Sequence, residues 1–152
     1  MIESFYFISA KEIEILLSVV LAIALGSLVG AERELHKRPA GLRTHILVCV
    51  GATLFTIASI NFIGTGDTSR IAAGIVTGIG FLGAGIMFRS ENHLEGVTTA
   101  ADLWVLSAIG ILIGIQYYVV AALSTIIILL VLYLGKKAKL MIKDEKETVA
   151  KK

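Results

Sequence analysis

The polar residues that could carry chemistry in this chain lie beside long apolar runs, at what the sequence predicts to be one common end of those runs. They are Glu32, Arg33, Arg43, His45, Arg89, Thr98, Thr99 and Asp102. Ionisable groups at membrane depth are costly, so each of these residues is a candidate for function. If the apolar runs form one bundle, we expect these side chains to converge on a polar pocket.

Two carboxylates, Glu32 and Asp102, are the plausible cation ligands in this set. Mg²⁺ prefers octahedral oxygen ligation and is usually held by one or two carboxylates together with water. A structural interpretation stays open for both residues. Thr99 and Asp102 have the T-x-x-D spacing of a helix capping box, and Glu32 with Arg33 could form an interfacial ion pair that includes Arg43. The metal ligands, if any, are therefore unknown at this stage.

The histidines and the single cysteine give weaker signals. His45 enters an apolar run, where we expect a local hydrogen bond, with metal binding as the alternative. His36 and His93 lie in polar links without zinc-ligand spacing. Cys49 lies in an apolar run and is expected to be a buried small hydrophobe, and a lone cysteine excludes an intrachain disulfide.

Enzyme signatures are missing from the sequence. It contains no HExxH, no GxSxG and no P-loop lysine motif. The glycines at 78, 80 and 83 resemble a dinucleotide fingerprint, but no strand precedes them. We predict that the chain is not an enzyme and has no catalytic residue. No cofactor is expected, apart from a Mg²⁺ ion that Glu32 and Asp102 could bind.

Composition places these residues in a membrane protein. The 152 residues are 56% hydrophobic and 17% charged, with a mean hydropathy of +0.85. Apolar runs of spanning length lie at about 13–31, 42–63, 71–88, 98–115 and 119–134. We predict an all-α, polytopic membrane bundle of about five transmembrane helices over 1–135, followed by a lysine-rich cytoplasmic tail over 136–152. The acidic residues before the first run argue against a cleaved signal peptide.

Basic residues predict the orientation of the bundle. The link over 32–43 carries four Lys and Arg residues and the tail carries seven lysines, whereas the loop over 64–69 and the turn at 116 carry none. The positive-inside rule then places the N-terminus outside and the C-terminus in the cytoplasm. No basic segment is interleaved with aromatic residues, so no nucleic-acid partner is expected.

The run between Arg70 and Arg89 looks like the central helix of the bundle. On a helical wheel its isoleucines form a narrow face that we expect to contact lipid, and its small residues form the other face, expected to pack against helices. Small-xxx-small spacing lets membrane helices approach closely. We predict that Gly78→Leu disrupts assembly, and that the chain forms a homo-oligomer. The predicted packing residues are Gly26, Gly30, Gly74, Gly78, Gly80, Gly83, Gly85, Gly110 and Gly114.

Three sequence blocks together resemble the MgtC/SapB family of bacterial and archaeal inner-membrane proteins, over roughly residues 15–115. The blocks are GxxxGxER leading to AGLRTH at 26–45, DxxRI leading to GIGFLGAG at 67–85, and TTAAxLW at 98–104. The resemblance implies a five-helix membrane domain linked to magnesium homeostasis and growth at low Mg²⁺. The polar residues that match the blocks are Glu32, Arg33, Arg43, His45, Asp67, Arg70 and Thr98.

Two departures from the family pattern limit what carries over. Many relatives have a small cytoplasmic domain after the last helix, and none is expected here. Position 102 is often a small polar residue such as serine, so no family role transfers to Asp102. The resemblance implies a non-enzymatic regulator that binds a membrane partner such as the F-type ATP synthase. The alternative is a transporter of Mg²⁺ or another cation, which the absence of charged residues at mid-bilayer disfavours.

Overall fold

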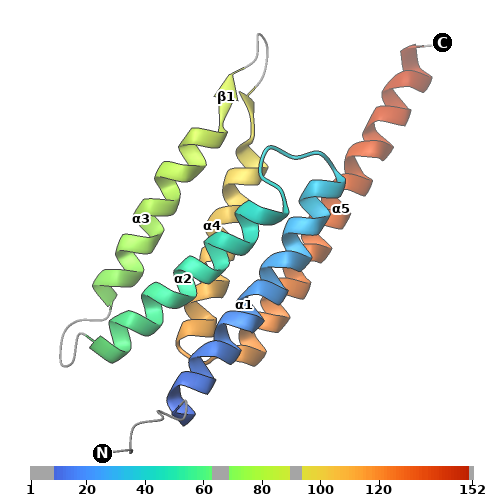
Figure 1. Cartoon of the computed structure of the whole chain (residues 1–152). Coiled ribbons are helices and arrows are strands. Elements are labelled where there is room, and N and C mark those ends of the chain that lie inside the picture. Colours follow the sequence, from blue (N-terminus) through green and yellow to red (C-terminus); the bar gives the residue numbers. More distant parts are fainter. Residues whose placement is uncertain (1–8, 63–68, 90–93, 151–152) are drawn as a thin grey trace, which may run out of the picture.

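The computed structural model describes residues 9–62, 69–89 and 94–150, which form five helices and one small hairpin (Figure 1). The elements are α1 (Ala10–Leu35), α2 (Leu42–Phe62), α3 (Ser69–Ile86), β1 (Phe88–Arg89), β2 (Leu94–Glu95), α4 (Val97–Gly114) and α5 (Tyr118–Ala150). All five helices are long and apolar enough to cross a membrane. The predicted all-α bundle of five membrane helices is therefore confirmed.

The helices alternate in direction, so the polar end of α1 lies beside the start of α2, the hairpin and the start of α4 (Figure 1). Helix α1 packs mainly on α2, and α2 packs on α4. Helices α3 and α5 cover the edges of this central group: α3 contacts mainly α4, and α5 contacts α4 and α1. The start of α1 and the end of α5 lie at opposite ends of the bundle.

Glycines permit the closest helix contacts in the centre. A Cβ atom on Gly110 would lie 2.5 Å from the Cys49 carbonyl oxygen, and one on Gly30 would lie 2.8 Å from the Leu42 Cα. Gly26 and Gly114 also face α2, and Gly83 meets Ala100 of α4. Five of the nine predicted packing glycines therefore lie at helix contacts within the chain.

Helix α3 is not the central helix, and its faces point the opposite way from the prediction. Only 11% of its spanning window is buried, against 50% for α4. Ile75 and Ile79 are buried against Val48, Ala52 and Leu103. Lipid tails are as apolar as isoleucine, so hydrophobicity does not decide which face turns inward; the branched side chains fill the space between the helices.

The small-residue positions of α3 make few contacts within the chain. A Cβ atom added at Gly74, Gly78, Gly80 or Gly85 would meet nothing within 4 Å. Their predicted role in packing does not hold inside one chain, and packing between copies stays a prediction.

The polar link before α4 contains an antiparallel pair, in which Phe88 pairs with Glu95 and Arg89 with Leu94. Gly96 then begins α4 with a φ of 84°, and a Cβ atom there would lie 2.5 Å from the Ile86 carbonyl oxygen. Both the backbone conformation and the close approach favour glycine at this position.

Helix α5 extends beyond the predicted boundary at 134. It runs for 33 residues to Ala150, so its length of about 50 Å exceeds the roughly 30 Å hydrocarbon core. The lysine-rich segment continues the last spanning helix, and the predicted domain boundary there stays a prediction.

Candidate functional site

Arg33, in the last turn of α1, is the centre of a buried ion-pair cluster. The residue is only 3% exposed, although arginine is rarely buried without a partner. Its Nη1 donates a hydrogen bond of 3.1 Å to Oδ2 of Asp102 in α4, and its Nε donates to Oε2 of Glu32. One guanidinium group therefore joins two carboxylates and ties α1 to α4.

Asp102 does not cap α4. The N-cap is Gly96, which gives no side-chain cap, and Asp102 lies in the second turn. The capping-box interpretation is therefore wrong, because α4 begins earlier than the T-x-x-D spacing requires. Asp102 is buried with a relative exposure of 7%, and its ion pair with Arg33 offsets the cost of that burial.

A polar chain leads from this ion pair to the surface through His36. The His36 Nδ1 lies 3.0 Å from Oε1 of Glu32 and 2.7 Å from the Glu32 carbonyl oxygen. The Lys136 Nζ lies 2.6 Å from the His36 Nε2. An ammonium group is a donor only, so this Nε2 accepts, and Nδ1–H donates to Glu32. The chain Lys136–His36–Glu32–Arg33–Asp102 thus connects α5, α1 and α4.

Sequence reasoning missed two members of this chain. The sequence places His36 in a polar link and Lys136 in the lysine-rich tail, so neither is among the predicted site residues. The spacing of Glu32 and His36, four residues apart at a helix end, is a signal that could have linked them. Lys136 lies 100 residues from His36 and offered no local signal.

His45 is fully buried near the same end of α1. Its Nδ1 lies 2.9 Å from the Gly41 carbonyl oxygen, which confirms the expected local hydrogen bond. A Cβ atom on Gly30 would lie 2.9 Å from the His45 Cβ, so the glycine makes room for the ring. The His45 Nε2 is buried and has no hydrogen-bond partner. Among the described residues, it is the one buried side-chain nitrogen or oxygen without such a partner.

The other predicted site residues whose side chains the structure describes form no ion pair with the Arg33 cluster. Thr99 is buried near the start of α4, whereas Arg43 and Thr98 are exposed. Arg43 is not the partner of Glu32. Arg70 begins α3 at the opposite end of the bundle (Figure 1). The backbone of Arg89 lies in β1, its side chain is not described, and Asp67 lies outside the described residues.

A contact that sequence reasoning did not identify fixes the start of α2. The Leu42 backbone N–H donates a 2.7 Å hydrogen bond to Oε2 of Glu34. An N–H at a helix start has no partner inside the helix, so this carboxylate satisfies it from the end of α1. Glu34 therefore helps to hold α2 next to the Arg33 cluster.

The cluster does not fit a Mg²⁺ site in this arrangement. Both candidate ligands, Glu32 and Asp102, are paired with Arg33, whose positive charge stands where the cation would bind. In the described part of the chain, no group of three or more His, Cys, Asp or Glu side chains could hold a metal ion. The arrangement is instead that of a buried structural ion pair.

The fold and this site define a class: a multi-pass helical membrane protein whose helices are joined by a buried ion-pair cluster at one end. The model of the MgtC family matches residues 19–141, and the chain belongs to that family.

Two curated proteins are similar to this chain over about three quarters of its length. Protein MgtC of Salmonella typhimurium strain LT2 is 46% identical over 114 residues, covering 75% of this chain and 49% of the relative. Protein MgtC of Brucella abortus strain 2308 is 46% identical over 110 residues, covering 72% of this chain and 46% of the relative. The chain thus spans about half the length of these curated relatives. No solved structure matches it.

Proposed function

We propose that this chain is a non-enzymatic protein of magnesium homeostasis that acts by binding partners within the inner membrane, and does not itself carry Mg²⁺. Membership of the MgtC family supports the link to magnesium. The Arg33 cluster is the main observation against transport. In it, one guanidinium group forms ion pairs with both carboxylates that could bind the ion.

The middle of the bundle supports the same choice. In the described parts of the five spans, charged side chains stand only near the ends. Mid-span polar groups are hydroxyls such as those of Thr56 and Thr125, which donate to carbonyl oxygens four residues earlier. A transport path for a divalent cation needs polar groups across the membrane, and the middle of the described spans offers no charged side chain for it.

The outer face of α3 is the surface we propose for partners. It consists of Ala73, Thr77, Gly80, Phe81 and Ala84, all of which are exposed. Phe81 is 81% exposed, and the Gly80–Ala84 pair has the small-xxx-small spacing that allows another helix to approach. A second copy of the chain is the first proposed partner. The F-type ATP synthase is the second proposed partner. In this proposal the end of α5 lies in the cytoplasm.

Two glycine variants test this surface. Gly80→Leu places a bulky side chain on the outer face of α3. Gly135→Leu is the control: it places the same side chain on α5, away from the proposed surface, and a Cβ atom at either glycine meets nothing within 4 Å. The oligomer is measured by light scattering in detergent, and co-elution with the ATP synthase by affinity purification of the tagged chain. We expect Gly80→Leu alone to lose both associations. A monomeric wild type that does not co-elute with the synthase would refute the proposal.

A further inference from the structure

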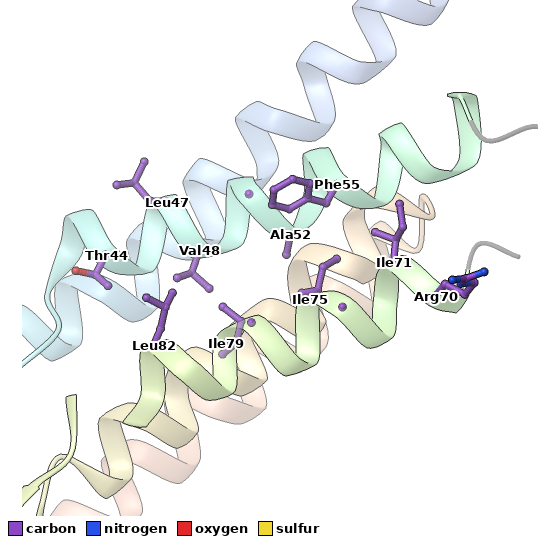
Figure 2. A pocket seen from close by; sticks show the side chains of 13 residues that line it. Thr44, Leu47, Val48, Ala52, Phe55, Arg70, Ile71, Ile75, Ile79 and Leu82 are labelled. Carbon is purple, nitrogen blue, oxygen red and sulfur yellow. The ribbon is translucent and has the colours of Figure 1, made fainter. Parts of the chain in front are cut away.

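A lateral groove separates α2 from α3 (Figure 2). It has a volume of about 750 Å³, within the range of roughly 300–1,000 Å³ found for ligand pockets. The groove exists because α3 packs on α4 and makes few contacts with α2. Its walls are mainly apolar and include Val48, Ala52, Phe55, Ile71, Ile75 and Ile79.

The floor of this groove is formed by glycine backbones. Gly51 of α2 and Gly74 and Gly78 of α3 line it, and a Cβ atom at any of the three would meet nothing within 4 Å. Each glycine therefore leaves open space. A larger residue at Gly78 would project into that space without striking another part of the chain.

The groove lies between two spanning helices, so hydrocarbon surrounds it and water does not wet its apolar walls. It extends along α3 from Arg70 to Leu82. Twelve residue steps give a length of about 18 Å, close to the roughly 15 Å depth of one leaflet. One acyl chain of a lipid therefore matches the groove in polarity and in length.

Arg70 provides a cationic group at one end of the groove, where the first turn of α3 begins (Figure 2). Its side chain is exposed, and no acidic side chain among the described residues pairs with it. The positive end of the helix dipole lies at the same place. An apolar helix of another protein offers nothing to this charge, whereas a phospholipid offers an anionic phosphate at headgroup depth.

We infer that the α2–α3 groove binds one glycerophospholipid, with an acyl chain against Phe55, Ile75 and Gly78. Its phosphate accepts hydrogen bonds from the Arg70 guanidinium group. The site is separate from the Arg33 cluster, which lies at the other end of the bundle, and from the outer face of α3. It does not depend on the proposed function.

Native mass spectrometry of the delipidated full chain in a neutral detergent tests this site. Phosphatidylglycerol is added, and the fraction of chains that retain one lipid is measured. We expect Gly78→Leu to lower the apparent affinity about tenfold, because leucine fills the groove. Gly135→Leu on α5 is the control, because Gly135 does not line the groove and a Cβ atom there meets nothing within 4 Å. We expect it to bind lipid like the wild type.

The headgroup is tested with Arg70→Gln and a second probe, diacylglycerol with the same acyl chains. Loss of a charged hydrogen bond predicts about tenfold weaker binding of phosphatidylglycerol and unchanged binding of diacylglycerol. Equal binding of phosphatidylglycerol by wild type and Arg70→Gln would overturn the assignment of the phosphate.

Two results would overturn the groove as a lipid site. The first is equal lipid retention by Gly78→Leu and the control Gly135→Leu. The second is a Gly78→Leu chain that keeps its lipid but becomes monomeric, which would make a second copy the occupant. Loss of lipid in Gly78→Leu with the oligomer intact would support the lipid site and contradict the sequence-based prediction that this variant disrupts assembly. Loss of the oligomer in Gly80→Leu with lipid intact would separately support the outer face of α3 as the partner surface.

Discussion

Arg33 and Asp102 show how a single buried pair can stabilise two helix ends in a membrane. Both side chains are buried, and they form an ion pair with each other. Removing one partner from a buried ion pair leaves an uncompensated charge, whereas replacing both with apolar residues can be neutral. The contribution of this ion pair is therefore better tested by comparing single and double substitutions than by one single substitution.

Arg33→Met should destabilise the protein by about 3–5 kcal/mol, because Asp102 and Glu32 both lose their counter-charge. The double variant Arg33→Met with Asp102→Leu should recover much of this loss. Unfolding in detergent, followed by circular dichroism, measures both. The control is Arg43→Met, at an exposed position nearby, with an expected change within about 0.5 kcal/mol. Equal stability of the Arg33 and Arg43 variants would contradict the assignment.

The sequence offered the Glu32–Arg33 ion pair as one alternative, and the structure contains it, but the second pair of Arg33, with Asp102, was not predicted. Arg33 and Asp102 are 69 residues apart, and their contact depends on α1 and α4 lying side by side. The capping interpretation failed because it needs the N-cap at Thr99, three residues after the observed N-cap, and Gly96 gives no side-chain signal. Local spacing describes one helix at a time, so it cannot report a pair between helices.

At the scale of elements, the interface of α2 and α4 depends on direct backbone approach. The Thr53 Oγ1 donates to the Gly110 carbonyl oxygen at 3.0 Å, as well as to the Cys49 carbonyl oxygen at 2.9 Å. Gly110 permits this distance because it has no side chain. Close approach and the interhelical hydrogen bond therefore depend on the same pair of positions.

Gly110→Ala should destabilise the bundle by about 1–3 kcal/mol, since its Cβ atom would lie 2.5 Å from a carbonyl oxygen of α2. Gly80→Ala is the matched control, because the same change meets open space and gains up to about 1 kcal/mol of helix propensity. Thermal unfolding in detergent should thus shift in opposite directions for the two variants. Shifts of the same sign would show that the α2–α4 contact is misassigned.

Thr53→Val should cost about 0.6 kcal/mol, a typical value for an interhelical hydrogen bond in a membrane protein. Thr77→Val is the comparison, because the Thr77 hydroxyl is exposed and donates only to the Ala73 carbonyl oxygen of its own helix. Chemical unfolding curves of the two variants in the same detergent measure the difference. No difference between them would mean that the Thr53–Gly110 bond adds nothing to stability.

The helix periodicity predicted two faces for α3 but assigned them the wrong way round. In a soluble protein the more apolar face turns inward, and that rule decides the orientation. In a membrane both the isoleucine face and the small-residue face are apolar, so shape decides which one packs. The same ambiguity did not affect α1 and α4, whose glycines Gly30 and Gly110 were predicted correctly as contact positions.

At the scale of the whole molecule, the number and limits of the spans were the most predictable features. Apolar length is a one-dimensional signal, and four of the five helices begin and end close to the predicted positions. The extension of α5 was missed because the predicted span ends where the apolar run ends. The polar residues that follow continue the same helix without a break. The direction of the bundle across the membrane remains a prediction from the basic residues.

Cysteine labelling tests this orientation on a Cys49→Ala background, since the native Cys49 is buried. Arg43 and Arg70 are exposed at opposite ends of the bundle. The positive-inside rule predicts that Arg70→Cys reacts with a membrane-impermeant maleimide in intact spheroplasts, and that Arg43→Cys reacts only after permeabilisation. The reverse pattern would place the Arg33 cluster outside the cell.

The most direct test of the account is the flux of Mg²⁺ into proteoliposomes that contain the purified, folded chain. Wild type, Glu32→Gln and Asp102→Asn are compared with protein-free vesicles by means of a trapped Mg²⁺ indicator. The account predicts no flux above the protein-free level in any of the three, because Arg33 occupies both carboxylates and the described spans carry no charged relay. Saturable flux in the wild type that is lost in either variant would contradict it and identify a transporter.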